Sequence, residues 1–211
     1  MIGALIALVA TAGDLAMLWV SNADRPDFAW LPRPPEGIDV VGARVGAVAL
    51  LAYGVGYVGV ARRLGRPADL RLIGLGIATG IVGASIHGLT GAAVHAQHVG
   101  GGPPTSPAEF LARHGGTLIP LWIVAAVLAI AASAVYATAV LQGASSLPRP
   151  MWAANPALLT VGLAAAGAAT PLLRAFLVPA APNVAHVLFF AAVAASPDLG
   201  KVLDTPRGAR R

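Results

Sequence analysis

Long stretches of apolar residues alternate along the chain with short segments rich in proline, glycine and charge. The apolar stretches cover about residues 2–20, 38–61, 72–96, 117–141, 156–178 and 182–196. About 20 apolar residues in a helix cross the hydrocarbon core of a bilayer. We therefore expect an all-α fold: a polytopic membrane bundle of six transmembrane helices that forms a single domain over residues 1–211.

Proline marks the expected boundaries in the last third of the chain. Asn155-Pro156 combines a capping residue with a proline at the first helical position, and so predicts a helix start. Thr170-Pro171 predicts a kink within the fifth span. The Pro-Ala-Ala-Pro segment at 179–182 predicts a tight turn between the fifth and sixth spans.

The composition excludes a soluble domain and a disordered chain. Only 11% of the residues are charged and 57% are hydrophobic, with a mean hydropathy of +0.75. The chain contains no cysteine, which excludes disulfides, iron–sulfur clusters and thiolate zinc. The first apolar stretch lacks a basic leader and carries Asp14, so we expect a retained helix rather than a cleaved signal peptide.

The basic residues predict the orientation. With the N-terminus in the cytoplasm, nine of them lie inside and four outside, as the positive-inside rule favours. The inner nine are Arg62, Arg63, Arg66, Arg71, Arg149, Lys201, Arg207, Arg210 and Arg211. The outer four are Arg25, Arg33, Arg113 and Arg174. We therefore expect both termini in the cytoplasm, and we attribute the net charge of +5 to this topology rather than to nucleic-acid binding.

The expected location is a bacterial cytoplasmic (inner) membrane, with the lipid bilayer as partner. Arginine supplies all the basic residues except Lys201, and alanine and glycine are abundant, which is typical of a GC-rich bacterial genome.

Ionisable residues within the expected spans, where charge is costly and usually functional, include Asp14, Arg44, His87 and His186. Asp14 and Arg44 lie roughly 9 Å below the outer ends of the first two spans, and His87 roughly 13 Å below that of the third. His186 lies close to the outer end of the sixth. Asp14 and Arg44 are candidates for a buried ion pair, and Arg44 alone has the alternative of extending to the interface.

Glycines predict which way His87 faces. Taking 100° per residue, one narrow stripe of the third span contains Gly76, Gly80, Gly83, His87, Gly91 and Val94. Such a stripe allows another helix backbone to approach closely, so His87 should point into the bundle. Gly42-x-x-x-Gly46 on the second span is a further close-packing motif.

Together these positions predict a polar pocket in the outer half of the bundle. Asp14 and His87 are its candidate catalytic acid/base or relay pair. Arg44, Asn183 and His186 are its candidate ligand-binding residues, with Asn183 at the mouth and segment 106–114 covering it. The alternative is a dry, fully paired network that only fixes helix packing.

Metal and cofactor binding have little support in the sequence. The weak metal candidates are His95, His98, Glu109 and His114, whose spacing matches no metal motif. A haem between His87 and His186 has less support still. Gly54-x-Gly56-x-x-Gly59 lies inside an apolar stretch rather than after a strand, so it does not predict a phosphate site. We expect no cofactor.

Short motifs along nearly the whole chain resemble DUF6796, a family of small bacterial integral membrane proteins of unknown function. They are Gly13-Asp14, Arg44, Ile86-His87-Gly88, Pro120, Pro148-Arg149-Pro150-Met151-Trp152 with Pro156, Asn183, Phe189-Phe190 and Ser196. The resemblance implies that Asp14, Arg44, His87 and Asn183 are the residues to test. It implies no activity.

Three function classes remain open on the sequence. One is a membrane-embedded enzyme or binding protein for a small lipidic molecule, and another is a proton-coupled transporter with the same residues as relay. The third is a non-catalytic structural or accessory membrane protein. The sequence contains no internal repeat, which counts against transport, and no strong catalytic motif, which counts against the enzyme.

Overall fold

The computed structural model describes residues 1–23, 25–64, 68–100 and 107–197, and every long element in them is helical. The helices are α1 (Ile2–Ala23), η1 (Pro26–Phe28), α2 (Ile38–Leu51), α3 (Tyr53–Ala61), α4 (Ala68–Val99), α5 (Pro107–Leu141), η2 (Arg149–Ala153), α6 (Pro156–Gly167) and α7 (Pro171–Ala195). The all-α fold class is therefore confirmed.

Five stretches of described helix are long and apolar enough to cross a membrane. They are Ile2–Ala23, Ile38–Ala61, Ala68–Val99, Glu109–Leu141 and Pro171–Ala195. The expected bounds of the second stretch agree with the structure, although the helix is interrupted at Ala52 between α2 and α3. α6 has only 12 residues, about 18 Å of helix, so the expected number of six long spans is not reached.

The expected boundary between the last two spans is wrong. Segment 179–182 is not a turn but lies inside the continuous helix α7. The chain reverses earlier, where the Thr170 hydroxyl accepts a hydrogen bond from the Leu173 amide and Pro171 occupies the first turn. A cap followed by proline starts a helix, whereas an interior proline is tolerated in a membrane helix whose neighbours support the backbone.

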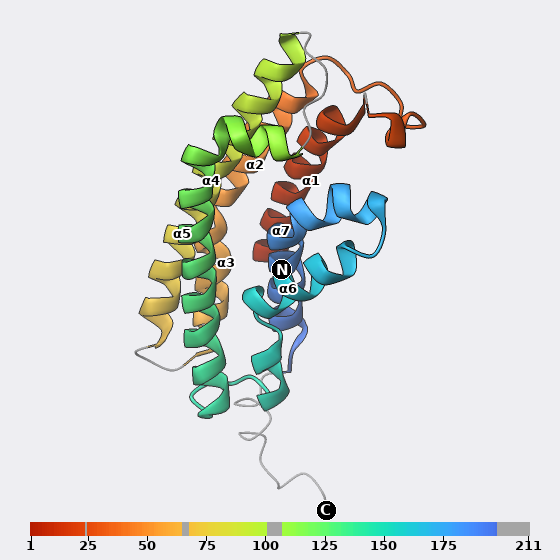
Figure 1. Cartoon of the computed structure of the whole chain (residues 1–211). Helices are drawn as coiled ribbons and strands as arrows, with labels where there is room; N and C mark the ends of the chain where they lie inside the picture. Colours follow the sequence, from red (N-terminus) through yellow and green to blue (C-terminus); the bar gives the residue numbers. More distant parts are fainter. Residues whose placement is uncertain (24, 65–67, 101–106, 198–211) are drawn as a thin grey trace, which may run out of the picture.

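The capping signal before α6 is confirmed. The side chain of Asn155 accepts a hydrogen bond from the Leu158 amide, and Pro156 opens the helix. α5 runs without a break from Pro107 to Leu141, so it begins before the expected span of 117–141. Figure 1 shows the first turns of α5 lying across one end of the bundle before the helix turns down along α4.

In space the helices form a curled row in the order α6, α7, α1, α2–α3, α4, α5, each packing against the next (Figure 1). α5 and α6, the two ends of the row, make few contacts with each other. The row therefore leaves a gap in its wall between α5 and α6.

The start of α1 and the last turns of α7 lie at the same end of the bundle. The backbone of Gly3 in α1 lies against Phe190 of α7 and Gly56 of α3. Beside them Arg63, which follows α3, binds the carbonyl oxygen of Pro197 at 2.9 Å and the hydroxyl of Ser146 at 2.7 Å. One arginine thus joins the ends of α3, α5 and α7.

Glycine lets α4 approach α2 and α3 closely. A Cβ added at Gly80 would collide with the backbone carbonyl of Leu50, and one at Gly91 would collide with Ala43. The expected stripe therefore does face neighbouring helices, and it brings His87 to the inside of the bundle, where 4% of the residue is exposed.

Candidate polar cavity

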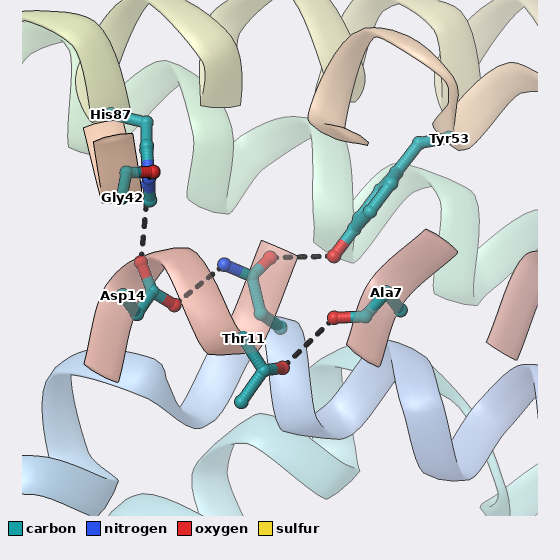
Figure 2. Close-up of polar contacts among 7 residues, drawn as sticks. Ala7, Thr11, Asp14, Gly42, Tyr53 and His87 are labelled. Atoms are coloured by element: carbon teal, nitrogen blue, oxygen red, sulfur yellow. Dashed lines mark hydrogen bonds and ion pairs between the residues drawn. The ribbon is translucent and has the colours of Figure 1, made fainter. Parts of the chain in front are cut away.

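The carboxylate of Asp14 and the imidazole of His87 meet inside the bundle (Figure 2). Asp14 lies on α1 and His87 on α4, and 3.1 Å separates the Asp14 Oδ1 from the His87 Nδ1. Both residues are buried. The close approach of these two side chains, expected from the glycine stripe, is present in the structure.

Asn183 of α7 and Tyr53 of α3 extend this contact. The Asn183 amide nitrogen donates to the Asp14 Oδ2 at 2.7 Å, and the Tyr53 hydroxyl donates to the Asn183 Oδ1 at 2.5 Å. Figure 2 draws these contacts as a line from Tyr53 to Asp14 and on to His87. We call Tyr53, Asn183, Asp14 and His87 the polar chain. It connects four helices.

Hydrogen-bond geometry determines how many protons the Asp14–His87 contact holds. The His87 Nε2 lies 3.2 Å from the carbonyl oxygen of Gly42. A carbonyl oxygen only accepts, so this nitrogen carries a hydrogen. The contact between the Asp14 Oδ1 and the His87 Nδ1 then needs one further proton, on either atom. The pair is neutral overall in both cases, as carboxylate with imidazolium or as carboxylic acid with imidazole.

A second buried histidine lies beside the polar chain. The His186 Nδ1 is 2.7 Å from the carbonyl oxygen of Pro182, so Nδ1 is a donor. The Tyr57 hydroxyl is 2.9 Å from the His186 Nε2 and donates to it in the neutral ring. The His186 ring also contacts the Tyr53 ring, with 4.7 Å between centroids. His186 therefore joins the polar chain through aromatic packing rather than through a hydrogen bond.

The polar chain and His186 line a cavity of about 360 Å³. This volume is within the range of small-molecule sites. All seven α-helices contribute to its wall, which is mainly apolar. Three lining residues near the gap between α5 and α6 are well exposed: Trp122 by 44%, Ile130 by 60% and Val161 by 68%. The cavity therefore has an apolar rim on the outer surface of the bundle.

Glycines create the space that the Asp14–His87 contact needs. A Cβ at Gly46 of α2 would overlap the His87 ring. A Cβ at Gly13 would lie 2.7 Å from the Gly42 carbonyl oxygen and 2.9 Å from the Gly46 Cα. The Gly42-x-x-x-Gly46 motif therefore packs α2 against α1, and it leaves room for the ring that reaches over from α4.

Arg44 does not belong to this cavity, and the ion pair with Asp14 is wrong. Asp14 uses both carboxylate oxygens on His87 and Asn183. Arg44 is exposed and has no hydrogen bond or ion pair with any residue that the structure describes. It lines a separate groove of about 290 Å³ between α2 and α4, together with His95. Arg44 lies on the side of α2 opposite Gly42 and Gly46, the two glycines that pack against α1 near Asp14.

Two of the expected depths also change. Asn183 lies in the middle of the polar chain rather than at a mouth, and His186 lies well inside the bundle, because α7 begins at Pro171 instead of near residue 182.

Segment 106–114 was expected to cover the cavity. Ser106 lies outside the described residues, and none of the residues from Glu109 to His114 lines the cavity.

His95 has a different partner from the metal set proposed for it. Its Nδ1 lies 2.9 Å from the Oδ2 of Asp39, a buried residue in the first turn of α2. His114 instead contacts the Phe110 ring. Among the described residues no three histidine, aspartate or glutamate side chains come close enough together to hold a metal ion.

Sequence reasoning missed Tyr53 and Tyr57. The two tyrosines are one helical turn apart in an otherwise apolar span, and a buried tyrosine usually needs a partner for its hydroxyl. That requirement was the available signal. It indicates a buried polar partner but does not identify Asn183 or His186.

Comparison with known proteins adds no identification. Neither a scan against protein-family models nor searches of curated proteins and solved structures found a match for the chain.

Proposed function

We propose that this chain is a multi-pass membrane protein that binds a small lipidic molecule in the cavity, with Asp14 and His87 as an acid/base pair for it. One observation carries the proposal: a buried carboxylate and imidazole in contact at 3.1 Å form part of the wall of a cavity of about 360 Å³. Ionisable groups inside a membrane bundle are functional candidates by default, and a cavity beside them gives a ligand access.

The cavity wall supports a lipidic ligand rather than a water-soluble one. The rim residues Trp122, Ile130 and Val161 are large, apolar and exposed on helices that would face hydrocarbon. A ligand dissolved in the bilayer reaches such an opening without leaving the membrane. The polar chain lines the same cavity as this rim, so it can meet the polar end of a ligand that enters there.

The Asp14–His87 pair supplies acid/base chemistry at low cost. The proton between the Asp14 Oδ1 and the His87 Nδ1 moves from one partner to the other without changing the net charge of the pair. A ligand group that gives a proton to the pair leaves the pair with a charge of +1 and itself with a charge of −1, so the ligand and the pair together stay neutral. Asn183 positions the carboxylate through its amide, and Gly42 positions the imidazole through its carbonyl oxygen.

The test is to identify small molecules that stay bound to the purified protein. We expect mass spectrometry of gently purified protein to find a lipidic molecule in amounts comparable to the protein. Ala129→Trp, which fills the cavity from α5, should abolish this retention. Val127→Trp on the same helix is the control, because Val127 is exposed and does not line the cavity. Equal retention by both variants would contradict the proposal.

For the topology we propose six crossings, with η2 and α6 together forming the short one, and both termini in the cytoplasm of a bacterium. The amide of Ala157 binds the Ser133 hydroxyl at 3.0 Å, so α6 begins beside a part of α5 that lies about two helical turns before its end at Leu141. Reporter fusions after Arg211 and within segment 103–106 test the proposal. Activity of the first reporter only outside the cytoplasm, or of the second only inside it, would overturn it. Membership of the DUF6796 family stays a prediction.

A structural role is the second candidate function. Each side chain of the polar chain has a partner within the protein, as a network that only fixes helix packing requires. This candidate predicts that the purified protein retains no small molecule. It also predicts that Ala129→Trp and Val127→Trp behave alike in every assay except stability.

A further inference from the structure

The cavity wall contains no group that would neutralise an anionic ligand. Among the described residues that line it there is no lysine or arginine. Arg44, the cation that the sequence placed there, lies in the groove between α2 and α4. The Asp14–His87 pair is neutral overall, as the hydrogen-bond geometry requires. A phosphate or carboxylate head inside this apolar cavity would therefore keep an uncompensated charge.

The polar groups of the wall keep free acceptors, the Asp14 carboxylate among them, and a few free donors. Three of the lining hydroxyls already donate within the protein: Tyr53 to Asn183, Thr79 to the Leu75 carbonyl, and Ser21 to the Met17 carbonyl. Two others, those of Thr90 and Thr160, and the indole N–H of Trp122 make no hydrogen bond with any described residue. The N–H groups of the two lining histidines are also used. Each of these hydroxyl oxygens, and the Asp14 carboxylate, keeps a free lone pair.

A head group that donates a hydrogen bond complements this wall. An aldehyde, ketone or ester offers only acceptors, so it can bind a free hydroxyl of the wall but leaves the Asp14 carboxylate without a donor. An alcohol donates one hydrogen bond and carries no charge, and the Asp14 carboxylate that would accept this bond lines the cavity. The remaining N–H of the Asn183 amide can donate to the oxygen of the alcohol.

We propose that the ligand of the cavity is a lipid alcohol, meaning a hydrocarbon body with an uncharged hydroxyl head. It enters sideways from the bilayer between α5 and α6, past Trp122, Ile130 and Val161, and its hydroxyl donates to the Asp14 carboxylate. This inference rests on the proposed function and specifies the chemical class of the ligand.

The experiment is photo-crosslinking of the full-length protein in lipid nanodiscs. The probe is 1-decanol that carries a diazirine in its chain, and peptide mass spectrometry locates the labelled residues. We expect labelling on lining residues of α5, α6 or α7. Unlabelled 1-decanol should compete at concentrations at least about tenfold lower than decanal or decyl phosphate, since one hydrogen bond to a charged group is worth about that factor.

Variants test the route. Val161→Trp at the rim should reduce labelling several-fold. Val127→Trp, a similar change on an exposed valine that does not line the cavity, should leave labelling unchanged. Equal effects of the two variants would overturn the sideways route between α5 and α6.

The competitors separate failure of this inference from failure of the proposed function. If decyl phosphate, decanal or decylamine competes as well as 1-decanol while labelling remains in the cavity, the alcohol is wrong and the binding site stands. If the probe labels only lipid-facing residues, and Ala129→Trp does not change the pattern, both proposals fall.

Discussion

Two aspartate–histidine pairs join α4 to a neighbouring helix, and their surroundings differ. Asp14 of α1 meets His87 in the interior, whereas Asp39 of α2 meets His95 about two helical turns further along α4. The side chain of His87 is 4% exposed and that of His95 is 44% exposed. The same two residue types therefore form an interior contact in one place and a helix-end contact in the other.

The carboxylates differ in how completely they are paired. The second oxygen of Asp14 accepts from Asn183, so the inner pair belongs to a chain of four side chains. The second oxygen of Asp39 is buried and has no hydrogen-bond partner among the described residues. Asp39 lies in the first turn of α2, where the helix dipole favours a negative charge. The comparison shows that a cavity with several polar partners, rather than the residue types, distinguishes the inner pair.

Removal of the histidines should separate the two pairs most strongly. His87→Leu leaves the Asp14 carboxyl in the interior with Asn183 alone, and we expect a loss of about 3 kcal/mol in the free energy of unfolding. His95→Leu should cost about 1 kcal/mol, because solvent reaches that pair through the half-exposed imidazole. Denaturation of both variants in mixed detergent micelles measures the difference. Equal losses would mean that the interior position adds nothing.

Two glycine substitutions near His87 test how closely the helices pack around the inner pair. Gly46→Ala places a Cβ on the His87 ring and should cost about 2 kcal/mol by driving the imidazole away from Asp14. Gly88→Ala is the control, because nothing lies near the Cβ it adds. That variant should be neutral or more stable by about 0.5–1 kcal/mol, since alanine is the better helix former. A larger loss for Gly88→Ala than for Gly46→Ala would refute this packing.

Double-mutant cycles test which residue is the partner of Asp14. The effects of Asp14→Asn and His87→Leu on the free energy of unfolding should be non-additive by about 1–2 kcal/mol, because the two side chains are in contact. Asp14→Asn and Arg44→Gln should be additive within about 0.5 kcal/mol. A large coupling energy between Asp14 and Arg44 would restore the ion pair that the structure replaces.

The smallest expected effect is at the far end of the polar chain. Tyr53→Phe removes the hydrogen bond to Asn183 and should lower the free energy of unfolding by about 1 kcal/mol. The matched variant Tyr136→Phe removes a hydrogen bond to the Met151 carbonyl oxygen, away from the cavity. Only Tyr53→Phe should also weaken crosslinking by the decanol probe. The same crosslinking change in both variants would indicate a general loss of packing.

The sequence by itself determined most of the helices and the direction of one key side chain. Apolar length gave the bounds 38–61 and most of α1 and α4, because a membrane requires about 20 apolar residues per crossing. The cap at Asn155 marked the start of α6. The glycine stripe indicated that His87 points inward, since helical periodicity alone decides which residues share a face.

Only the tertiary structure decided the partners. Periodicity does not say which helix lies against a given face, so Arg44 and Asn183 were equally available to Asp14, and helix rotation chose Asn183. The depth of Asn183 and His186 depended on where α7 begins, and moving that start from about 182 to Pro171 shifted both by about 16 Å along the helix axis. From the sequence alone, Pro179 and Pro182 indicated a turn. They lie inside a helix because neighbouring helices support the backbone around them, and no local sequence pattern contains those neighbours.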